Sequence, residues 1–190
     1  LSDGTWLAGA SVEPDRWETF VDRSTDGGKT WTASNYFPID TNEISGKGAI
    51  QPTLWESEPG KVHMLIRTGG GVIARSDSED YGKTWTPIYK TDMPNPNSGI
   101  DLTKLPDGTL ALTYNPDNKN WGSRSPLKLA LSYDNGKTWP DQIDLDKSEE
   151  KDEYSYPAII SWGDSIASTY TWNRKTIALW LGTKQDVANN

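Results

Sequence analysis

The stretch SEDYGKTW at residues 78–85 has two close copies in the chain, STDGGKTW at 24–31 and SYDNGKTW at 132–139. The aspartates are equally spaced, because 80 − 26 and 134 − 80 both equal 54. A fixed period of this length is typical of a repeat architecture. In the shared pattern Ser-x-Asp-x-Gly-x-Thr-Trp, the Asp can accept bonds from the amides of the turn, and Gly can supply a positive φ. The pattern therefore predicts a repeated hairpin turn.

Short strand-like segments surround each turn. The clearest unit has them at 50–57, 61–67, 72–78 and 85–91. Such segments, β-branched and aromatic with no helical period, are typical of the four-stranded antiparallel blades of a β-propeller. The sequence thus predicts an all-β fold with about three and a half blades. We expect blade units at roughly 1–44, 45–94, 95–148 and 149–190.

The first blade unit, 1–44, is expected to start at a turn without its opening strand, and the fourth, 149–190, has strands but no Asp turn. Propellers have at least four blades, so we expect the chain to be one half of a closed ring. The missing half would come from upstream sequence or from a second chain. The charged run at 146–153 is expected to be a solvated connection between blades.

Composition excludes several classes of function. The net charge of −8 argues against nucleic acid and anionic membranes as partners. The absence of Cys excludes disulfides and thiolate metal sites, and no apolar run approaches the ~20 residues of a membrane span. The 10 Trp and 8 Tyr, against 2 Phe, are aromatic side chains with polar groups, suited to sugars as well as to burial. No metal and no cofactor is predicted.

Strand direction divides the loops of a blade between two faces. With strands named A to D, the start of A and the B-to-C loop share one face, and the A-to-B and C-to-D turns share the other. The Asp turns are C-to-D turns, so we expect their face to be structural. Scaffold roles are therefore predicted for Asp26, Asp80, Asp134, Trp31, Trp85 and Trp139.

The opposite face collects four of the six arginines, one in each unit: Arg16, Arg67, Arg124 and Arg174. Arg suits bidentate capture of a carboxylate, so this pattern indicates an anionic ligand. The alternative for each Arg is a salt bridge to a loop carboxylate such as Glu13, Asp15 or Asp117.

The same face receives the starts of the A strands and further polar or aromatic loop residues. Amides and hydroxyls can bond sugar hydroxyls, and Trp rings can stack on a sugar. The predicted binding residues, besides Arg16 and Arg174, are Glu13, Gln51, Asn97, Ser98, Asn115, Trp121, Trp172 and Asn173. The only His, His63, lies mid-strand, where packing is expected rather than catalysis, and with one His no Ser/His/Asp set is expected.

These residues resemble a known family. The Asp turns resemble the Asp-boxes, or BNR repeats, of sialidases, and the whole chain resembles the C-terminal half of sialidase-like six-bladed propellers. The resemblance is carried by GAIQPTLWE at 48–56, MPNPNSGIDLTKLPDGTLALTYN at 93–115, EYSYPAII at 153–160 and YTWNR at 170–174. It implies a glycan substrate and a secreted protein.

The resemblance also implies site roles. Sialidases hold the sialic carboxylate with three arginines, use a Tyr nucleophile activated by a Glu, and protonate the leaving group with an Asp. By position, Arg124 is similar to one arginine and Tyr156 to the nucleophile, with Tyr154 as the competing assignment. Arg67 and Arg174 are arginines on the same face.

The chain departs from the sialidase pattern at the Glu. Where sialidases carry it before LPDG, this chain has Asn97 to Gly99, which leaves Asp101 or Glu153 as the substitute. The first arginine and the acid Asp would belong to the missing half. Three functions therefore remain open: an exo-glycosidase acting on a terminal sialic or uronic acid, a lyase that cleaves uronic-acid linkages, and a non-catalytic glycan-binding propeller.

Overall fold

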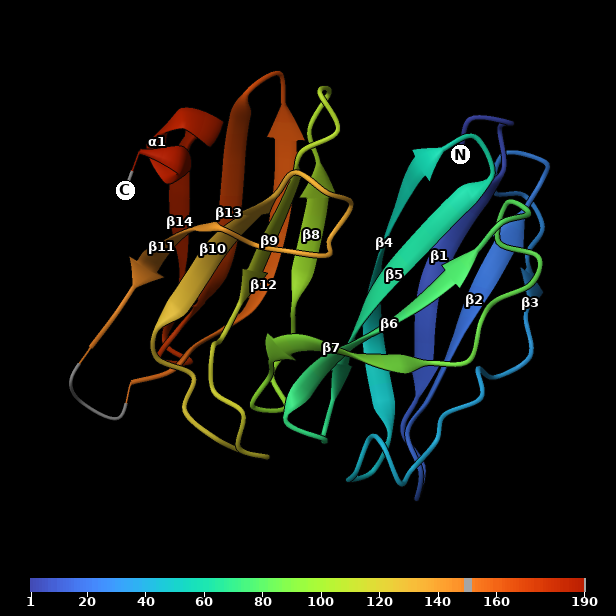
Figure 1. The fold of residues 1–190 in the computed structure, drawn as a ribbon, viewed down its shortest axis with the longest axis horizontal. Helices are drawn as coiled ribbons and strands as arrows, with labels where there is room; N and C mark the ends of the chain where they lie inside the picture. The colour runs from blue at the N-terminus through green and yellow to red at the C-terminus, as the bar shows by residue number, and fades with distance from the viewer. Residues whose placement is uncertain (149–151, 190) are drawn as a thin grey trace. The chain divides into compact units, whose positions relative to one another are not determined.

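The computed structural model describes residues 1–148 and 152–189. Their strands form four antiparallel sheets, each built from one continuous stretch of sequence (Figure 1). Contacts divide the chain into two compact units, Leu1–Met93 and Pro94–Asn190. The prediction of an all-β fold with repeated antiparallel sheets is confirmed. No helix within the described ranges is long and apolar enough to cross a membrane.

The first unit contains a three-stranded and a four-stranded sheet. The three-stranded sheet has the order β1 (Trp6–Val12), β2 (Glu18–Ser24) and β3 (Thr32–Ala33). The four-stranded sheet has the order β4 (Ala49–Glu58), β5 (Lys61–Thr68), β6 (Val72–Ser78) and β7 (Tyr89–Pro94). Strand β4 packs against β1 and β2. The apolar core between the sheets includes Val21, Phe37, Ile44, Met64, Ile66 and Ile88.

The second unit repeats this plan. One sheet has the order β8 (Asp101–Lys104), β9 (Leu110–Tyr114), β10 (Leu127–Ser132) and β11 (Asp141–Asp146). The other has the order β12 (Tyr154–Trp162), β13 (Ser165–Trp172) and β14 (Thr176–Thr183), and β12 packs against β8. Part of the predicted connection at 146–153, residues 149–151, lies outside the described residues.

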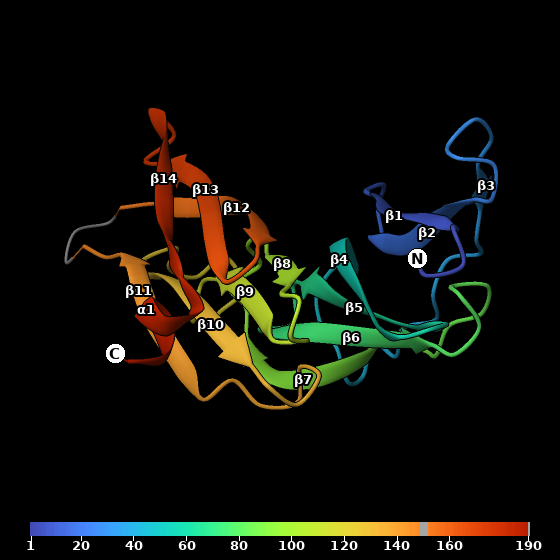
Figure 2. The same cartoon turned by 90° about the horizontal axis from the view of Figure 1, so that it is seen from above.

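A short helix, α1 (Lys184–Ala188), was not expected from a sequence without a helical period. Thr183 and Asp186 form a capping box at its start, so two side chains satisfy amides that a helix leaves unpaired. Val187 is buried in the core of this unit, where α1 lies beside β10, β11 and β14 (Figure 2). A helix of one turn is too short to show a period, which explains the miss.

The three Asp turns have the same geometry. In each, the Asp carboxylate accepts two backbone N–H bonds of 2.9–3.0 Å and bonds the hydroxyl of the following Thr. The leading Ser donates to the Asp at 2.8–2.9 Å, and its hydroxyl accepts from the amide of the shared Gly at 2.9 Å. Each turn is therefore closed by its own side chains.

These bonds favour the ionised carboxylate. At Asp26, hydrogen bonds from the side chain and amide of Thr30 lower the pKa to about 2. At Asp134, partial burial raises the pKa, but bonds from Thr138 outweigh it and bring the pKa down to about 2. Since both values lie below the ordinary Asp value of about 3.9, the folded chain binds fewer protons here than the unfolded chain.

We predict acid sensitivity that originates in the turns. The stabilisation from Asp26 and Asp134 is fully present above pH ~4 and is lost as the pH falls toward 2. Replacing Asp134 by Asn should lower the unfolding midpoint at pH 7 and flatten its decline between pH 4 and 2. Urea unfolding followed by Trp fluorescence at several pH values measures both. Asp164→Asn, in a turn outside the repeat, is the control, and an equal acid response in both variants would contradict the assignment.

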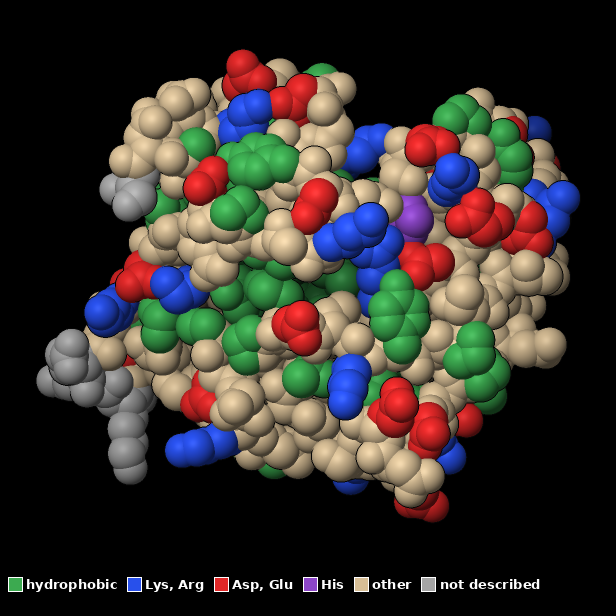
Figure 3. All heavy atoms as spheres, in the orientation of Figure 1, with side chains coloured by type: hydrophobic (Ala, Val, Ile, Leu, Met, Phe, Trp, Pro, Cys, Tyr) green, Lys and Arg blue, Asp and Glu red, His purple; other side chains and the backbone are tan. Residues whose placement is uncertain are grey.

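One face of the last sheet is apolar and exposed. Ile177, Leu179 and Leu181 alternate along β14 with exposed fractions of 74%, 64% and 62%, and Ile160 and Trp162 on β12 are exposed by 63% and 52%. Trp180, between two of them, packs into the core on the opposite side. On the face drawn in Figure 3, in contrast, acidic and basic side chains are interspersed. Soluble monomers rarely expose an apolar patch of this kind.

We predict that the 190-residue chain self-associates through this patch. Replacing Ile177, Leu179 and Leu181 by Thr keeps a strand-forming side chain and removes the apolar surface. Light scattering should show species above 21.1 kDa for the original chain and less association for the triple variant. Thr169, Thr171 and Thr176 exchanged for Ser provide a control in the same sheet. A monomeric original chain at micromolar concentration would contradict this prediction.

Candidate functional site

Four of the predicted site residues meet at one end of the second unit. Arg124 lies in the loop between β9 and β10, Arg174 lies in the turn between β13 and β14, and Tyr156 lies near the start of β12. Glu153, directly before β12, joins the two arginines. Its Oε1 accepts from Arg124 Nη1 and its Oε2 from Arg174 Nε, both at 2.9 Å. In this unit the strand starts and B-to-C loops do share a face.

Glu153 is held as a carboxylate. Partial burial raises its pKa, but the hydrogen bonds from Ser155 and Arg174 and the charges of both arginines outweigh this effect and lower the pKa below its usual value. The Ser155 hydroxyl donates to Oε1 at 2.8 Å. A carboxylate with these partners fixes the two guanidinium groups in place.

Arg124 is the inner of the two arginines. Its side chain is 10% exposed, against 68% for Arg174. Its guanidinium carbon lies 5.1 Å from the centre of the Tyr156 ring, within cation–π range. Its Nη2 donates a long 3.4 Å bond to the carbonyl of Asn97. Arg124 is therefore positioned by the segment before β8 and by the start of β12.

The two candidate tyrosines lie in different environments. Tyr156 is 47% exposed, whereas Tyr154 is 2% exposed and its ring lies 6.5 Å from that of Trp172. The Tyr154 hydroxyl donates to Asp152 at 3.0 Å, and burial together with this bond raises the pKa of Tyr154 to about 12. Of the two, Tyr156 is the one that an external ligand can reach beside Arg124.

A β-bulge turns Tyr156 toward the surface. The register of β12 shifts between Ser155 and Ala158, and Tyr156 has a φ of +50°. Strand β4 repeats this feature, since its register shifts between Ile50 and Thr53 and Gln51 has a φ of +55°. Left-handed backbone costs a non-Gly residue roughly 1–2 kcal/mol, and bulges re-aim side chains next to functional sites. Both residues precede a Pro, the one signal of the bulge in the sequence.

An open pocket of about 580 Å³ is lined by Arg124, Glu153 and Arg174, and Tyr156, stacked on Arg124, lies outside this lining. Its charged lining consists of three acids and three bases, Asp117, Asp152, Glu153, Lys119, Arg124 and Arg174, which formally balance. Trp121 also lines it, with 65% of its surface exposed and a φ of +59°. The pocket thus offers an aromatic surface next to paired charges.

Asn115 supports the site from beneath. It is fully buried, and its Nδ2 lies 2.9–3.0 Å from the carbonyl oxygens of Arg124, Pro126 and Tyr154. It thereby ties the Arg124 loop to the start of β12. The Nδ2 is used on backbone groups, whereas the buried Oδ1 has no hydrogen-bond partner among the described residues. Direct contact of Asn115 with a ligand stays a prediction.

Asn97 and Ser98 are likewise buried. Asn97 has a φ of +60°, and its Nδ2 donates to Asn120 Oδ1 at 3.0 Å. The Ser98 amide and carbonyl are both bonded by the Asn95 side chain, and its hydroxyl is without a partner among the described residues. These two residues shape the segment that contacts Arg124, and their direct contact with a ligand stays a prediction.

Asp101 and Trp172 have structural surroundings. Asp101 accepts from the backbone N–H groups of Leu102 and Ile159 at 2.9 Å, so its carboxylate ties β8 to β12. The role of Asp101 as a substitute for the catalytic Glu stays a prediction. Trp172 is half-buried and packs against Tyr154 and Tyr170, and its role as a stacking platform likewise stays a prediction.

The turn that carries Arg174 is strained. Asn173 and Arg174 both have a φ of +52°, and the Lys175 amide bonds the Trp172 carbonyl at 3.0 Å, as in a two-residue hairpin turn. Gly is the favoured residue at the second position, so an Arg there is held against its backbone preference. Asn173 Oδ1 accepts from the Glu153 amide at 2.7 Å, and its Nδ2 donates to Asp152 at 3.0 Å. The turn is anchored to the same carboxylates as the pocket.

The remaining predicted residues lie in the first unit. Arg67 is buried, with its Nη1 3.0 Å from Gln51 Oε1 and its guanidinium carbon 5.5 Å from the centre of the Trp17 ring. Arg16 is exposed and makes a 3.4 Å bond to the Ile39 carbonyl, and Glu13 is exposed. Arg67 and Gln51 therefore form a second polar pair, at the position of the repeated bulge.

Sequence reasoning missed Ser155, Asp152 and Asn120. Ser155 and Asp152 flank Glu153 in the chain, and their position next to the predicted carboxylate was the available signal. Asn120 bonds Asn97 across a loop, and no local pattern marks such a pair. Across residues 1–148 and 152–189, no group of His, Cys, Asp and Glu is arranged to hold a metal ion.

The sequence and the repeated turns match a known family over most of the chain. Residues 1–168 match the BNR repeat-like domain. The chain belongs to the BNR repeat-like domain family. Two similar curated proteins are sialidases: that of Paraclostridium sordellii is 26% identical over 138 residues, covering 62% of this chain and 33% of the relative, and that of Micromonospora viridifaciens is 34% identical over 124 residues, covering 61% and 19%.

Solved structures show the same fold. The Hadza microbial sialidase Hz136 aligns with 98% of this BNR chain at a TM-score of 0.79 and 20% identity, using 36% of its own length. Sialidase structures of this kind are β-propellers, so the sheets described above have the fold of propeller blades. The chain spans between 17% and 33% of the length of the curated relatives it matches.

We predict that the left-handed backbone at Arg174 affects thermal stability, which can be tested independently of function. Arg174→Gly relieves the left-handed strain, whereas Arg174→Ala keeps it, and both remove the same ion pair. The Gly variant should melt about 2–4 °C above the Ala variant. Circular dichroism melting curves provide the measurement, with Lys175→Gly and Lys175→Ala as the matched pair at a neighbouring position. A Gly variant less stable than the Ala variant would refute the turn geometry.

Proposed function

We propose that this chain is part of a sialidase-like exo-glycosidase that acts on a terminal acidic sugar, sialic or uronic acid. The observation that carries the proposal is the meeting of Arg124, Arg174 and Tyr156 beside an open pocket of about 580 Å³. Family membership and the sialidase relatives support the same class. A glycan partner and secretion follow from this proposal.

Arg174 receives the sugar carboxylate. It binds Glu153 through Nε, its side chain is 68% exposed, and it lines the pocket. Arg124, packed on Tyr156, adds positive charge from below. Trp121 gives an apolar surface for the ring, and Lys119 and Ser123 complete the polar edge of the pocket. Asn173, which bonds Asp152 beside the pocket, remains a predicted ligand residue. Arg67, Arg16, Gln51 and Glu13 remain predicted ligand residues of the first unit.

In the hydrolase form, the Tyr156 oxygen attacks the anomeric carbon or stabilises its developing positive charge. Its proton passes to a carboxylate, for which Glu153 is the candidate in this unit. The acid that protonates the leaving group belongs to the part of a six-bladed ring outside this chain. Within this chain, the blade units are at roughly 1–44, 45–94, 95–148 and 149–190, and the Asp turns act as their Asp-boxes.

A second candidate is a non-catalytic glycan-binding propeller. One observation favours it: Glu153 is bonded to two arginines with its pKa lowered, and Asp101 is bonded to two backbone amides. Glu153 is therefore a weak proton acceptor, and the Asp101 carboxylate is engaged in tying β8 to β12. A pocket with balanced charges and an exposed Trp is suited to the recognition of sugar hydroxyls as much as to catalysis.

We predict that product mass spectrometry separates these functions. The intact protein that contains this chain is incubated with glycans ending in sialic, glucuronic or rhamnosyl-glucuronic units. The hydrolase releases an acidic sugar with one water added, and the Tyr156→Phe variant loses turnover while its affinity stays within about tenfold, or ~1.4 kcal/mol. Tyr36→Phe, at an exposed tyrosine of the first unit, is the control.

Other outcomes decide against the leading proposal. An unsaturated product assigns a lyase, in which a base removes the proton next to the carboxylate. Binding without any product assigns the glycan-binding propeller. Unchanged turnover in Tyr156→Phe would exclude Tyr156 as nucleophile.

A further inference from the structure

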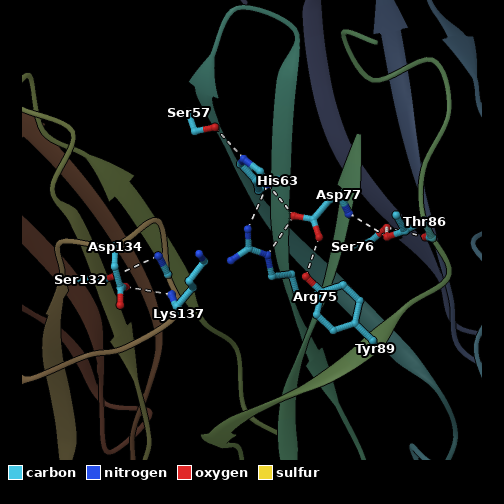
Figure 4. Close-up of polar contacts among 11 residues, drawn as sticks. Ser57, His63, Arg75, Ser76, Asp77, Thr86, Tyr89, Ser132, Asp134 and Lys137 are labelled. Atoms are coloured by element: carbon cyan, nitrogen blue, oxygen red, sulfur yellow. Dashed lines mark hydrogen bonds and ion pairs between the residues drawn. The ribbon is translucent and has the colours of Figure 1, made fainter. Parts of the chain in front are cut away.

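A second chemical constellation lies in the first unit, away from the arginines described above. Figure 4 shows Ser57, His63 and Asp77 joined in a line. The Ser57 hydroxyl lies 2.7 Å from His63 Nε2, and His63 Nδ1 lies 2.5 Å from Asp77 Oδ1. The expectation that one His makes no Ser/His/Asp set is therefore wrong, because β4, β5 and β6 each contribute one of these residues.

Asp77 is fixed as an ionised orienting group. Tyr89 donates to its Oδ2 at 2.5 Å, and Arg75 Nε donates to its Oδ1 at 2.9 Å (Figure 4). Burial raises the pKa of Asp77, but the hydrogen bonds from His63 and Tyr89 and the Arg75 charge outweigh this and lower it to about 2. An ionised carboxylate only accepts hydrogen bonds.

The acceptor at Asp77 decides the tautomer of His63. Nδ1 has two polar neighbours, Asp77 Oδ1 at 2.5 Å and the donor Arg75 Nη2 at 3.0 Å (Figure 4). The closer carboxylate calls for a hydrogen on Nδ1, and in this tautomer Nε2 accepts from the Ser57 hydroxyl. The Trp55 ring packs beside the His63 ring, with the two ring centres 5.1 Å apart and the two ring planes tilted by 33°. Arg75 packs over the other side of the network, 5.2 Å from the Trp55 ring. This is the arrangement of nucleophile, base and orienting carboxylate found in hydrolytic triads.

Ser57 is placed by another β-bulge. The register of β4 and β5 shifts between Glu56 and Glu58, so Ser57 has no Cα partner in the register. Bulged residues leave the ladder and re-aim their side chains. Here the bulge directs a half-buried hydroxyl toward His63.

We propose that Ser57, His63 and Asp77 form a serine-nucleophile site that accepts small, uncharged carboxylic esters. The Ser57 oxygen bonds to the ester carbonyl carbon while its proton moves to His63 Nε2. The carbon–oxygen bond to the alcohol then breaks, and the alcohol leaves with that proton. Water, deprotonated by His63, releases the acyl group as a carboxylic acid and restores Ser57. Glu56 and Glu58 on either side disfavour anionic esters.

The test uses a fluorophosphonate probe on the full chain, followed by peptide mass spectrometry. Attack forms an Oγ–phosphorus bond and expels fluoride, with the proton passing to His63. We expect modification at Ser57 and at least a tenfold slower labelling in Ser57→Ala and His63→Gln. Ser161→Ala is the control, because that half-buried hydroxyl bonds Thr103 rather than a histidine.

Ester turnover supplies a second readout. The unmodified chain should release p-nitrophenol from p-nitrophenyl acetate with a burst that Ser57→Ala lacks. Mapping the label on the unmodified chain keeps the test valid if a variant folds poorly. No label at Ser57, or labelling spread over exposed serines at equal rates, would overturn the proposal and assign the network a purely structural role. Neither result depends on the glycosidase proposal, which concerns the second unit.

Discussion

The carboxylate in each Asp turn is the constraint on which the rest of the fold depends. It satisfies two amides and a threonine hydroxyl within eight residues, so the turn needs no help from distant parts of the chain. A turn closed locally fixes where the strand before it ends, as it does for β2, β6 and β10. Because the strand ends are fixed on that side, the loops on the opposite side can differ from unit to unit. The variable loops are those that carry Arg124 and Arg174.

The sequence was most informative where chemistry is local. The spacing of Asp26, Asp80 and Asp134, together with the strand patterns between them, predicted the sheets and the face on which Arg124, Glu153, Tyr156 and Arg174 meet. What could not be predicted depends on pairs far apart in the chain. Asn115 looks like a loop residue, and only the folded chain shows its amide among three carbonyl groups. Asp101 looks like a free carboxylate until Ile159, 58 residues later, donates to it.

Glu153 places opposing demands on the candidate site. By bridging two arginines it gives them a defined geometry, and by the same bonds it loses basicity. A ligand carboxylate that binds Arg174 competes with Glu153 for the same guanidinium, and such competition would return basicity to Glu153. Binding of the ligand carboxylate and the basicity of Glu153 are then linked through the Arg174 side chain. The exposure of Arg174, in contrast to the burial of Arg124, makes it the arginine at which this exchange is sterically open.

Strained backbone marks the positions where the fold departs from regular strands. Tyr156, Gln51 and Arg174 all have left-handed φ values, and the bulge at Ser57 is the second register shift in β4 after the one at Gln51. Regular antiparallel pairing would direct these side chains by simple alternation. The departures instead bring Tyr156 beside Arg124, Gln51 beside Arg67 and Ser57 beside His63. Since each departure lowers stability unless a specific contact compensates for it, their coincidence with the polar clusters argues that the clusters, rather than packing, account for the irregular geometry.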